Sequence, residues 1–198
     1  KTQRQANGLD EKRVREQAKE VKALNAKFAQ EGFRIFHGIE VDILPDGSLD
    51  FDDETLGFFD FVIAAVHGQF TLPVEAQTAR ICTALAHPLV TMLAHPTGRL
   101  LLEREAYAVN MEAVIEAAAK HKKIIEINAH PHRLDMDWRL WKRAKERGVR
   151  CSINPDAHCL PDFQYLAVGV GIARKGWLTK RDAVNCLPLK EVGKALRK

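Results

Sequence analysis

An α/β fold built on a parallel sheet is the fold class that this sequence of 198 residues predicts. Five short segments rich in β-branched and aliphatic residues alternate along the chain with longer segments of helical periodicity. That alternation is typical of βαβ units and of a parallel sheet, either open or closed into a barrel. A closed barrel usually needs about 250 residues and eight strands. We therefore expect a barrel that lacks its opening βα units, which agrees with a start at Lys1 instead of Met; a complete five-stranded open sheet is the competing interpretation.

The first third of the chain predicts one long helix and two strands. Asp10–Gln30 has apolar residues at helical spacing among charges, with an N-cap at its start and Gly32 as a stop signal. Arg34–Glu40 is short and rich in β-forming residues, and the turn sequence Leu44-Pro45-Asp46-Gly47 follows it. Phe61–Val66 is predicted to be a buried strand because of its valine, isoleucine and phenylalanine content.

The rest of the chain repeats the pattern of helix and strand. The remaining predicted strands are Thr91–Ala94, Ile124–Asn128 and Val149–Ile153. The remaining predicted helices are Val74–Ala86, which Pro88 ends, Met111–Lys120, Trp138–Arg147, which Gly148 ends, Phe163–Arg174, Arg181–Cys186 and Glu191–Lys198.

Composition excludes several classes of protein. Hydrophobic residues make up 46% and charged residues 28%, which is typical of a globular domain and excludes a wholly disordered chain. The longest uncharged apolar run, Phe61–Val66, is far shorter than the roughly 20 residues of a membrane span. A net charge of +4 permits a phosphorylated partner without requiring one. The cysteines form no C-x-x-C pair, so we expect reduced thiols in a cytoplasmic protein; they are Cys82, Cys151, Cys159 and Cys186.

Acidic and imidazole side chains recur where predicted strands end. Glu40, His67 and His95 each close a strand, and Asp156 and His158 lie just past the fifth. The carboxyl ends of parallel strands share one rim, so these side chains should converge. A single histidine after a strand is most often structural, but the joint pattern favours a metal site. One glutamate and two histidines suit zinc, manganese or iron and leave a position open for water.

Two arginines follow strand ends on the same rim. Arg99 and Arg133 can present a planar fork to phosphate oxygens, and the alternative is a solvated arginine or one that pairs with a carboxylate. Glu126 shares its strand with Asn128 and is expected to be a buried, hydrogen-bonded support and not a base. The basic residues of the helix Trp138–Arg147 are expected to form a solvated face.

Several blocks of sequence resemble a known domain. Gly38-Ile39-Glu40-Val41-Asp42-Ile43-Leu44, with the Asp46–Asp50 segment after it, resembles the PHP (polymerase and histidinol phosphatase) domain of bacterial and archaeal family X DNA polymerases. The resemblance covers nearly the whole chain. The further blocks that carry it are Ala94-His95-Pro96-Thr97-Gly98-Arg99-Leu100, Glu126-Ile127-Asn128-Ala129 with Arg133-Leu134-Asp135, Asp156-Ala157-His158, and Arg174-Lys175-Gly176-Trp177-Leu178.

The resemblance implies a distorted (β/α)7 barrel with up to three divalent ions (zinc, manganese or iron), of which residues 1–198 are the C-terminal portion. By it, Glu40, His67 and His95 bind one metal, Glu40 bridges to a second that Asp156 reaches, and His158 binds a third. The implied catalytic residues are Glu40, Asp156, Arg99 and Arg133. The family's other ligands belong to sequence that precedes Lys1, so we expect this chain to bind about one metal tightly and to hydrolyse little. Pro155 and His130 depart from the family pattern.

The implied reaction is phosphoester hydrolysis, with DNA 3′ ends as the favoured substrate of a 3′–5′ exonuclease or 3′-phosphatase in repair. A polymerase domain upstream in the same chain would be the partner, and no membrane is expected. The alternatives are a small-molecule phosphatase of the histidinol phosphate type and a non-catalytic metal-binding domain that supports a polymerase. A barrel without its first units has an edge strand, which we expect at Arg34–Ile39, paired with another copy or covered by the helix Asp10–Gln30.

Overall fold

The computed structural model describes residues 8–196 and contains one sheet of five parallel strands. Their order across the sheet is the same as their order in the sequence, β1-β2-β3-β4-β5. The strands are β1 (Gly38–Asp42), β2 (Phe61–Ala65), β3 (Met92–Leu93), β4 (Ile124–Asn128) and β5 (Cys151–Asn154). The predicted α/β class with a parallel sheet is confirmed.

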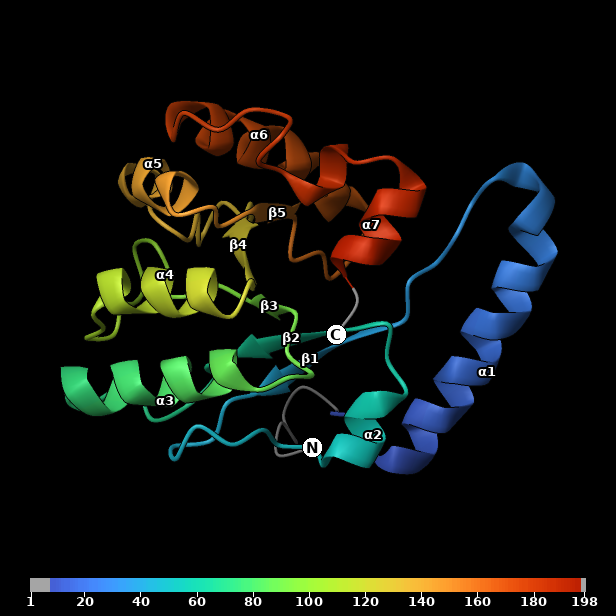
Figure 1. Ribbon diagram of the computed structural model, residues 1–198, viewed down its shortest axis with the longest axis horizontal. Helices are drawn as coiled ribbons and strands as arrows, with labels where there is room; N and C mark the ends of the chain where they lie inside the picture. Colours follow the sequence, from blue (N-terminus) through green and yellow to red (C-terminus); the bar gives the residue numbers. More distant parts are fainter. Residues whose placement is uncertain (1–7, 197–198) are drawn as a thin grey trace.

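The helices that follow β2, β3, β4 and β5 lie together against the sheet. Parallel strands joined in sequential order by right-handed crossovers place their helices on one face, and Figure 1 shows α3 to α6 following the curve of the sheet. This arrangement is consistent with part of an α/β barrel. Within residues 8–196, β1 and β5 form the two edges of the sheet. These helices are α3 (Val74–Ala86), α4 (Met111–Lys120), α5 (Trp138–Glu146) and α6 (Leu166–Lys175).

The hydrophobic core has two parts, one on each face of the sheet. The larger part lies between the sheet and the layer of α3 to α6, where Val62, Leu85, Ile115, Ile127 and Trp141 are buried. The smaller part lies between the other face and the C-terminal segment, which contains η4 (Val184–Cys186) and α7 (Leu189–Ala195). Met92, Ile124, Val184 and Leu196 form this second cluster. The C-terminal segment also extends the sheet, because Ala183 pairs in parallel with Cys151.

The N-terminal helix stands to one side of the sheet (Figure 1). α1 (Glu11–Phe28) begins where Asp10 accepts a hydrogen bond from the Arg13 amide, and it continues into η2 (Ala29–Glu31) before Gly32 adopts a positive φ of 68°. Both predicted end signals are confirmed. No helix among residues 8–196 is long and apolar enough to cross a membrane. All four cysteines are free.

β1 begins later than the predicted strand Arg34–Glu40. The Asn25 side chain holds both the N–H and the C=O of Ile35, at 2.7 and 2.8 Å, so this residue is occupied by α1 and not by the sheet. Pairing with β2 starts at Gly38, where a Cβ would come within 2.2 Å of the Phe61 ring. The prediction that Glu40 ends its strand is therefore wrong, because Glu40 lies in the middle of β1.

The expected cover of the edge strand is confirmed for the segment just before β1. Besides the Asn25 bonds, Gln17 of α1 lies 2.9 Å from the His37 ring. β1 itself pairs with β2 on one side only, within the part of the chain that the structure describes.

Other short elements differ from prediction. α2 (Asp53–Gly57) was not predicted, although the Asp52 carboxylate caps it at the Thr55 amide. Arg181–Cys186 was predicted as a helix and contains only the single turn η4, and α6 is preceded by η3 (Leu160–Tyr165). The last helix is α7, which ends at Ala195, and the final two residues of its predicted range lie outside the described residues.

Candidate metal centre

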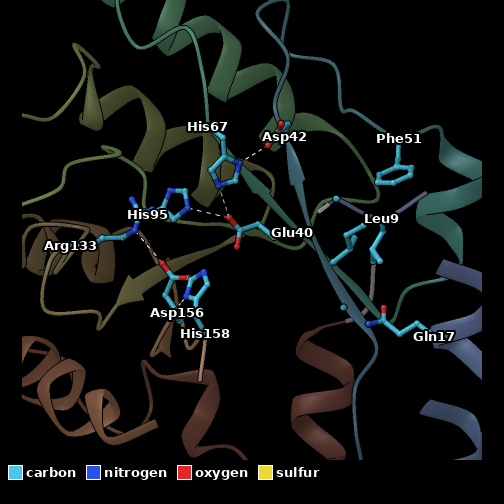
Figure 2. Close-up of a pocket in the computed structure, with 13 residues that line it drawn as sticks. Leu9, Gln17, Glu40, Asp42, Phe51, His67, His95, Arg133, Asp156 and His158 are labelled. Atoms are coloured by element: carbon cyan, nitrogen blue, oxygen red, sulfur yellow. Dashed lines mark hydrogen bonds and ion pairs between the residues drawn. The ribbon is translucent and has the colours of Figure 1, made fainter. Parts of the chain in front are cut away.

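Three strands bring one carboxylate and two imidazoles together. The Oε1 atom of Glu40 lies 2.9 Å from His67 Nε2 and 3.1 Å from His95 Nε2. The potential ligand atoms of these residues all lie within 4.8 Å of one another. Figure 2 shows both imidazoles turned toward the Glu40 carboxylate. The structure therefore brings together the three residues on which the sequence analysis placed the first metal.

Strand register explains how residues far apart in sequence meet here. Side chains alternate between the two faces of a strand, so Ile39 and Val41 enter the core while Glu40 points to the opposite, more open face. Glu40 is in register with Ile63 of β2. His67 follows the end of β2, and His95 follows β3 with a positive φ of 22°.

Hydrogen bonds and charge within the cluster stabilise the ionised form of Glu40 and the protonated form of His67. Burial raises the pKa of Glu40, but hydrogen bonds and charge from His67 and His95 outweigh burial and hold that pKa well below its usual value. Burial lowers the pKa of His67, yet hydrogen bonds to Asp42 and Glu40 raise it to about 9. The carboxylate thus favours positive charge at the position of the two imidazoles, which is the charge that a divalent ion provides.

Asp42 is a site residue that the sequence analysis missed. Its Oδ1 lies 2.5 Å from His67 Nδ1, the nitrogen that faces away from Glu40. Histidines that bind metals commonly have the second nitrogen fixed by a carboxylate, which sets the orientation of the ring. The signal was present, because Asp42 is two residues beyond Glu40 and so lies on the same face of β1.

Arg80 is a second residue that was missed. It is buried in α3, and its guanidinium donates to the carbonyl oxygens of Ile43, Leu44 and Gly68. These carbonyls belong to the loops after β1 and β2, so Arg80 ties together the loops that hold Asp42 and His67. Nothing in the sequence around Arg80 indicated this role, because an arginine in an amphipathic helix usually faces solvent.

The Glu126 carboxylate lies next to His95 and accepts hydrogen bonds from a backbone amide and two asparagine side chains. Glu126 is buried and accepts hydrogen bonds from the His95 amide at 2.7 Å, from Asn154 at 2.8 Å and from Asn128 at 3.2 Å. Burial raises the pKa of Glu126 to about 7, against the charge of His95 and the bond from Asn154. The expectation that Glu126 is a buried, hydrogen-bonded support is confirmed.

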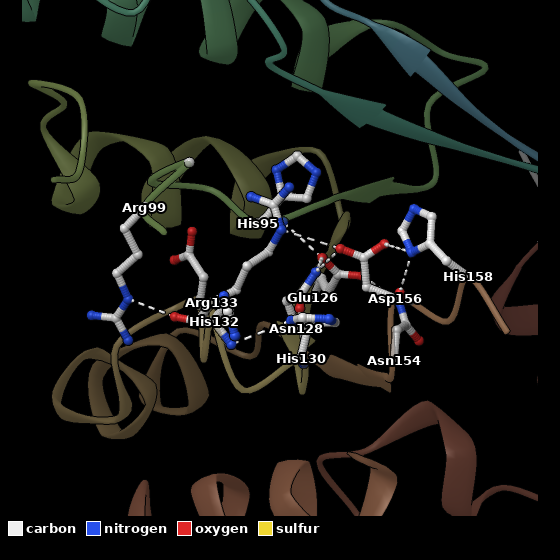
Figure 3. Close-up of polar contacts among 12 residues, drawn as sticks. His95, Arg99, Glu126, Asn128, His130, His132, Arg133, Asn154, Asp156 and His158 are labelled. Atoms are coloured by element: carbon white, nitrogen blue, oxygen red, sulfur yellow. Dashed lines mark hydrogen bonds and ion pairs between the residues drawn. The ribbon is translucent and has the colours of Figure 1, made fainter. Parts of the chain in front are cut away.

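Asp156 and Arg133 form a pair at the side of the same cavity. Asp156 Oδ2 accepts hydrogen bonds from Asn128 Nδ2 at 3.0 Å and from Arg133 Nε at 3.1 Å (Figure 3). His158 lies beside them with an 81% exposed side chain, and its Nδ1 is 2.8 Å from the Asp156 carbonyl oxygen. Among the described residues, the close ligand cluster contains only Glu40, His67 and His95. The structure therefore brings Asp156 and His158 to the rim but not into contact with that cluster.

One open cavity of about 490 Å³ is lined by the ligand cluster together with Asp42, Arg133, Asp156 and His158. Its floor carries Glu40, His67 and His95, and one wall carries Arg133, Asp156 and His158. The opposite wall contains Leu9 and Gln17 from the N-terminal segment (Figure 2). The cavity is thus wide enough for a phosphate group with part of its ester substituents.

No family model matches the sequence, but individual proteins do. The chain is 44% identical over 193 residues to the DNA polymerase/3′-5′ exonuclease PolX of Bacillus subtilis, a match that covers 98% of this chain and 34% of that protein. The resemblance to the PHP domain of family X DNA polymerases is confirmed.

Probable phosphatases are also similar to this PHP-like chain. One from Thermoanaerobacter sp. (strain X514) is 29% identical over 165 residues, covering 78% of this chain and 65% of the phosphatase. Another, from Caldanaerobacter subterraneus subsp. tengcongensis, is 31% identical over 138 residues, covering 65% of this chain and 52% of the phosphatase. This chain therefore spans about a third of the PolX relative and under two thirds of each phosphatase.

The three central residues of the PHP-like chain fit a divalent metal ion. Two imidazole nitrogens and one carboxylate oxygen are a ligand set typical of catalytic zinc, where a fourth position stays open for water. Here the two Nε2 atoms converge on one oxygen of Glu40, whose side chain is 39% exposed to the cavity. The cluster therefore has the donor atoms that can hold a metal ion and an open side for a further ligand.

Other rim residues of the PHP-like chain point elsewhere. Arg99 donates from Nε to the Arg133 carbonyl oxygen at 2.8 Å, and also to the Leu134 carbonyl and the Asp137 carboxylate. Figure 3 shows Arg99 away from Asp156, and the residues that line the cavity do not include it. Its geometry favours a role in holding the loop after β4.

The two histidines of the His-Pro-His segment make contacts outside the ligand cluster. His132 Nδ1 lies 3.0 Å from Glu103, and the His130 ring packs against Tyr165 with ring centroids 5.1 Å apart. The basic residues of α5 are partly paired with acids of neighbouring elements, for example Arg143 with Glu112 at 2.8 Å. The expected solvated face on α5 is therefore only partly solvated.

Proposed function

We propose that this chain is a metal-dependent phosphoesterase domain that trims or processes the 3′ ends of DNA as part of a family X polymerase. The observation that carries the proposal is the Glu40–His67–His95 cluster in an open cavity that also presents an arginine. The similarity to PolX supports the choice of DNA, because that relative is a DNA polymerase and a 3′-5′ exonuclease.

The proposed ligands of the first metal are Glu40, His67 and His95. Asp156 and His158 face the same cavity and are proposed as ligands of further ions, up to three ions in all, of zinc, manganese or iron. A bound divalent ion would supply a Lewis acid and a water of lowered pKa for attack on phosphorus. Asp42 would keep the His67 ring in its ligand orientation.

Arg133 is the proposed contact to the substrate phosphate. Asp156 fixes its Nε, so the guanidinium is held at the cavity wall with its planar fork available for phosphate oxygens. A cation held in place before the reaction can offset charge that develops on those oxygens in the transition state. Arg99 supports this indirectly, since it bonds the Arg133 carbonyl oxygen.

The same proposal extends to the complete barrel, the partner domain and the cellular location. Residues 1–198 would form the C-terminal portion of a distorted (β/α)7 barrel, and further strands would meet the edges at β1 and β5. The parallel pairing of Ala183 beside β5 supports continuation of the sheet on that side. A polymerase domain of the same polypeptide would be the partner, and the cytoplasm is the proposed location because the four cysteines are unpaired.

A labelled DNA strand tests this function directly. We expect Mn²⁺-dependent release of nucleotides or phosphate from the 3′ end by the natural polypeptide, and no release by its Glu40→Gln variant. Hydrolysis of histidinol phosphate without action on DNA would favour a small-molecule phosphatase, which the similarity to probable phosphatases also allows. Tight metal binding with no hydrolysis of any phosphoester would favour a structural domain.

A further inference from the structure

We propose that Asp135 is the positioning residue of His95, holding its imidazole in the orientation that binds metal; this inference rests on the proposed metal function. His95 Nδ1 and Asp135 Oδ1 are buried atoms that have no hydrogen-bond partner among the described residues, and Asp135 bonds Thr97, two residues after His95. His95 is 2% exposed and Asp135 is fully buried. Buried polar atoms normally have partners, so each of these calls for one.

Thr97 links the two residues. It lies two positions after His95 and donates to Asp135 Oδ2 from both its amide and its hydroxyl, each at 2.9 Å. Burial raises the pKa of Asp135, and the Thr97 bonds and the charge of nearby His95 oppose that effect. One carboxylate oxygen is thus fixed against the loop that carries His95, while the other is left for a different donor.

The chemistry of a metal-bound imidazole supplies that donor. His95 Nε2 faces Glu40 at 3.1 Å and is the atom that would bind metal. A neutral imidazole that gives the lone pair of Nε2 to a metal carries its proton on Nδ1. That N–H is buried and needs an acceptor, which Asp135 Oδ1 provides across one water molecule. His67 already has the equivalent arrangement, with Nδ1 beside Asp42.

The other unpartnered atoms do not compete for this role. Gln77 Nε2 and Trp141 Nε1 are donors, and they belong to helices of the outer layer. Glu112 Oε1 is an acceptor on α4, and it forms an ion pair with Arg147. Asp135 is therefore the acceptor that remains among the buried unpartnered atoms of residues 8–196.

The substitution Asp135→Asn replaces the acceptor Oδ1 by an NH₂ donor and keeps the shape of the side chain. In Asp135→Asn the two Thr97 donors require the amide oxygen on their side, so the NH₂ group takes the place of Oδ1. When His95 binds metal, the water that accepts from its Nδ1–H then loses the oxygen atom to which it donates. In the metal-free protein the Nδ1 lone pair can instead accept from that water, which accepts in turn from the NH₂ group. The variant should therefore disfavour the metal-bound form and not the metal-free fold.

Zn²⁺ titration of the chain against a chromogenic chelator tests the inference. We expect Asp135→Asn to weaken Zn²⁺ binding by about 10- to 100-fold, with the melting temperature of the metal-free protein close to wild type. Thr97→Val is the matched control, because it removes the hydroxyl bond to the other oxygen of the same carboxylate, Oδ2. It should lower the melting temperature and leave Zn²⁺ affinity near the wild-type value.

The outcomes separate this inference from the proposed function. A wild-type chain that binds no Zn²⁺ overturns the metal function and the inference with it. Wild-type binding together with an unchanged affinity of Asp135→Asn overturns the inference alone. If the variant does not fold, NMR of the wild-type chain with ¹⁵N-histidine decides. A His95 Nδ1 proton protected from exchange in the Zn²⁺-loaded protein supports the inference, and rapid exchange of that proton overturns it.

Discussion

Glu40 is the residue on which the candidate centre depends, because one of its oxygens contacts both imidazoles. Glu40→Gln keeps the shape and removes the negative charge that a metal and the two histidines share. We expect Zn²⁺ affinity to fall by about 100-fold or more, as for loss of a ligand together with its support of the others. Equilibrium dialysis with metal analysis measures this.

The matched control for Glu40→Gln is Glu54→Gln, the same chemical change at a carboxylate whose side chain is 81% exposed and does not line the cavity. It should bind Zn²⁺ as the wild type does. Equal loss in both variants, or no loss in Glu40→Gln, would show that the cluster is not the metal site.

Arg133 separates substrate binding from metal binding. Its guanidinium is held at the cavity by Asp156, and loss of one donor to a developing charge typically costs about 10²- to 10³-fold in rate. In the natural polypeptide, Arg133→Ala should lower kcat/KM for DNA 3′ ends by about 10²-fold with unchanged metal content. Arg133→Lys should also be impaired, because an ammonium group cannot form the bidentate fork.

Arg99→Ala is the comparison for Arg133→Ala. Since Arg99 bonds backbone carbonyls and Asp137, we expect it to lower the melting temperature more than Arg133→Ala does. Wild-type activity of Arg133→Ala would contradict the phosphate role.

The sequence predicted the metal-ligand residues better than the residues that hold those ligands in place. His67 and His95 follow strands and could be placed by that position alone. Asp42 was predictable from alternation along β1, but Arg80 and Asp135 were not. Their roles depend on loops and buried atoms that come together only in the folded chain, so the local sequence around them carries no sign of the contact.

Among the elements, α1 holds the segment before β1 through Asn25. Its side chain forms two hydrogen bonds with the Ile35 backbone, each of which contributes about 0.5–1.5 kcal/mol. Asn25→Ala should therefore lower the free energy of unfolding by about 1–3 kcal/mol. Chemical denaturation followed by circular dichroism measures it.

Glu20→Ala is the control for Asn25→Ala on the same helix, since Glu20 is exposed. It should have a much smaller effect on stability. If the two variants are equally stable, α1 does not hold the segment before β1.

The start of β1 shows why the bounds of elements were harder to predict than their type. Arg34–Phe36 has the composition of a strand, yet Asn25 from a helix ten residues earlier occupies its backbone at Ile35. The opposite error occurred at Arg181–Cys186, which was predicted to be a helix. The structure has only one helical turn there, and Ala183 just before it forms a parallel β-bridge. In both places a tertiary contact overrode local preference.

Across the whole molecule, the sequential strand order is what unites the site. Because β1, β2 and β3 are neighbours and parallel, His67 and His95, which follow β2 and β3, lie at one edge of the sheet beside Glu40 of β1. The regular alternation of strand and helix was sufficient to predict that, and the confirmed class follows from it. No such pattern predicted how the C-terminal segment packs on the face of the sheet opposite α3 to α6. There the Leu196 carbonyl oxygen accepts a hydrogen bond from the Thr91 hydroxyl.

A metal bound at this edge would link three strands at once, so it should stabilise the entire domain. A ligand that binds only the folded state at 100 times its dissociation constant adds about 2.7 kcal/mol. For a chain of this size each kcal/mol raises the melting temperature by about 2–4 °C, so Zn²⁺ should raise it by about 5–10 °C. EDTA should reverse the rise, and at the same Zn²⁺ concentration the melting temperature of Glu40→Gln should rise by no more than about 1–2 °C. A wild-type melting temperature that does not respond to Zn²⁺, at concentrations where dialysis shows binding, would mean that the ion is held outside the folded β1–β3 edge.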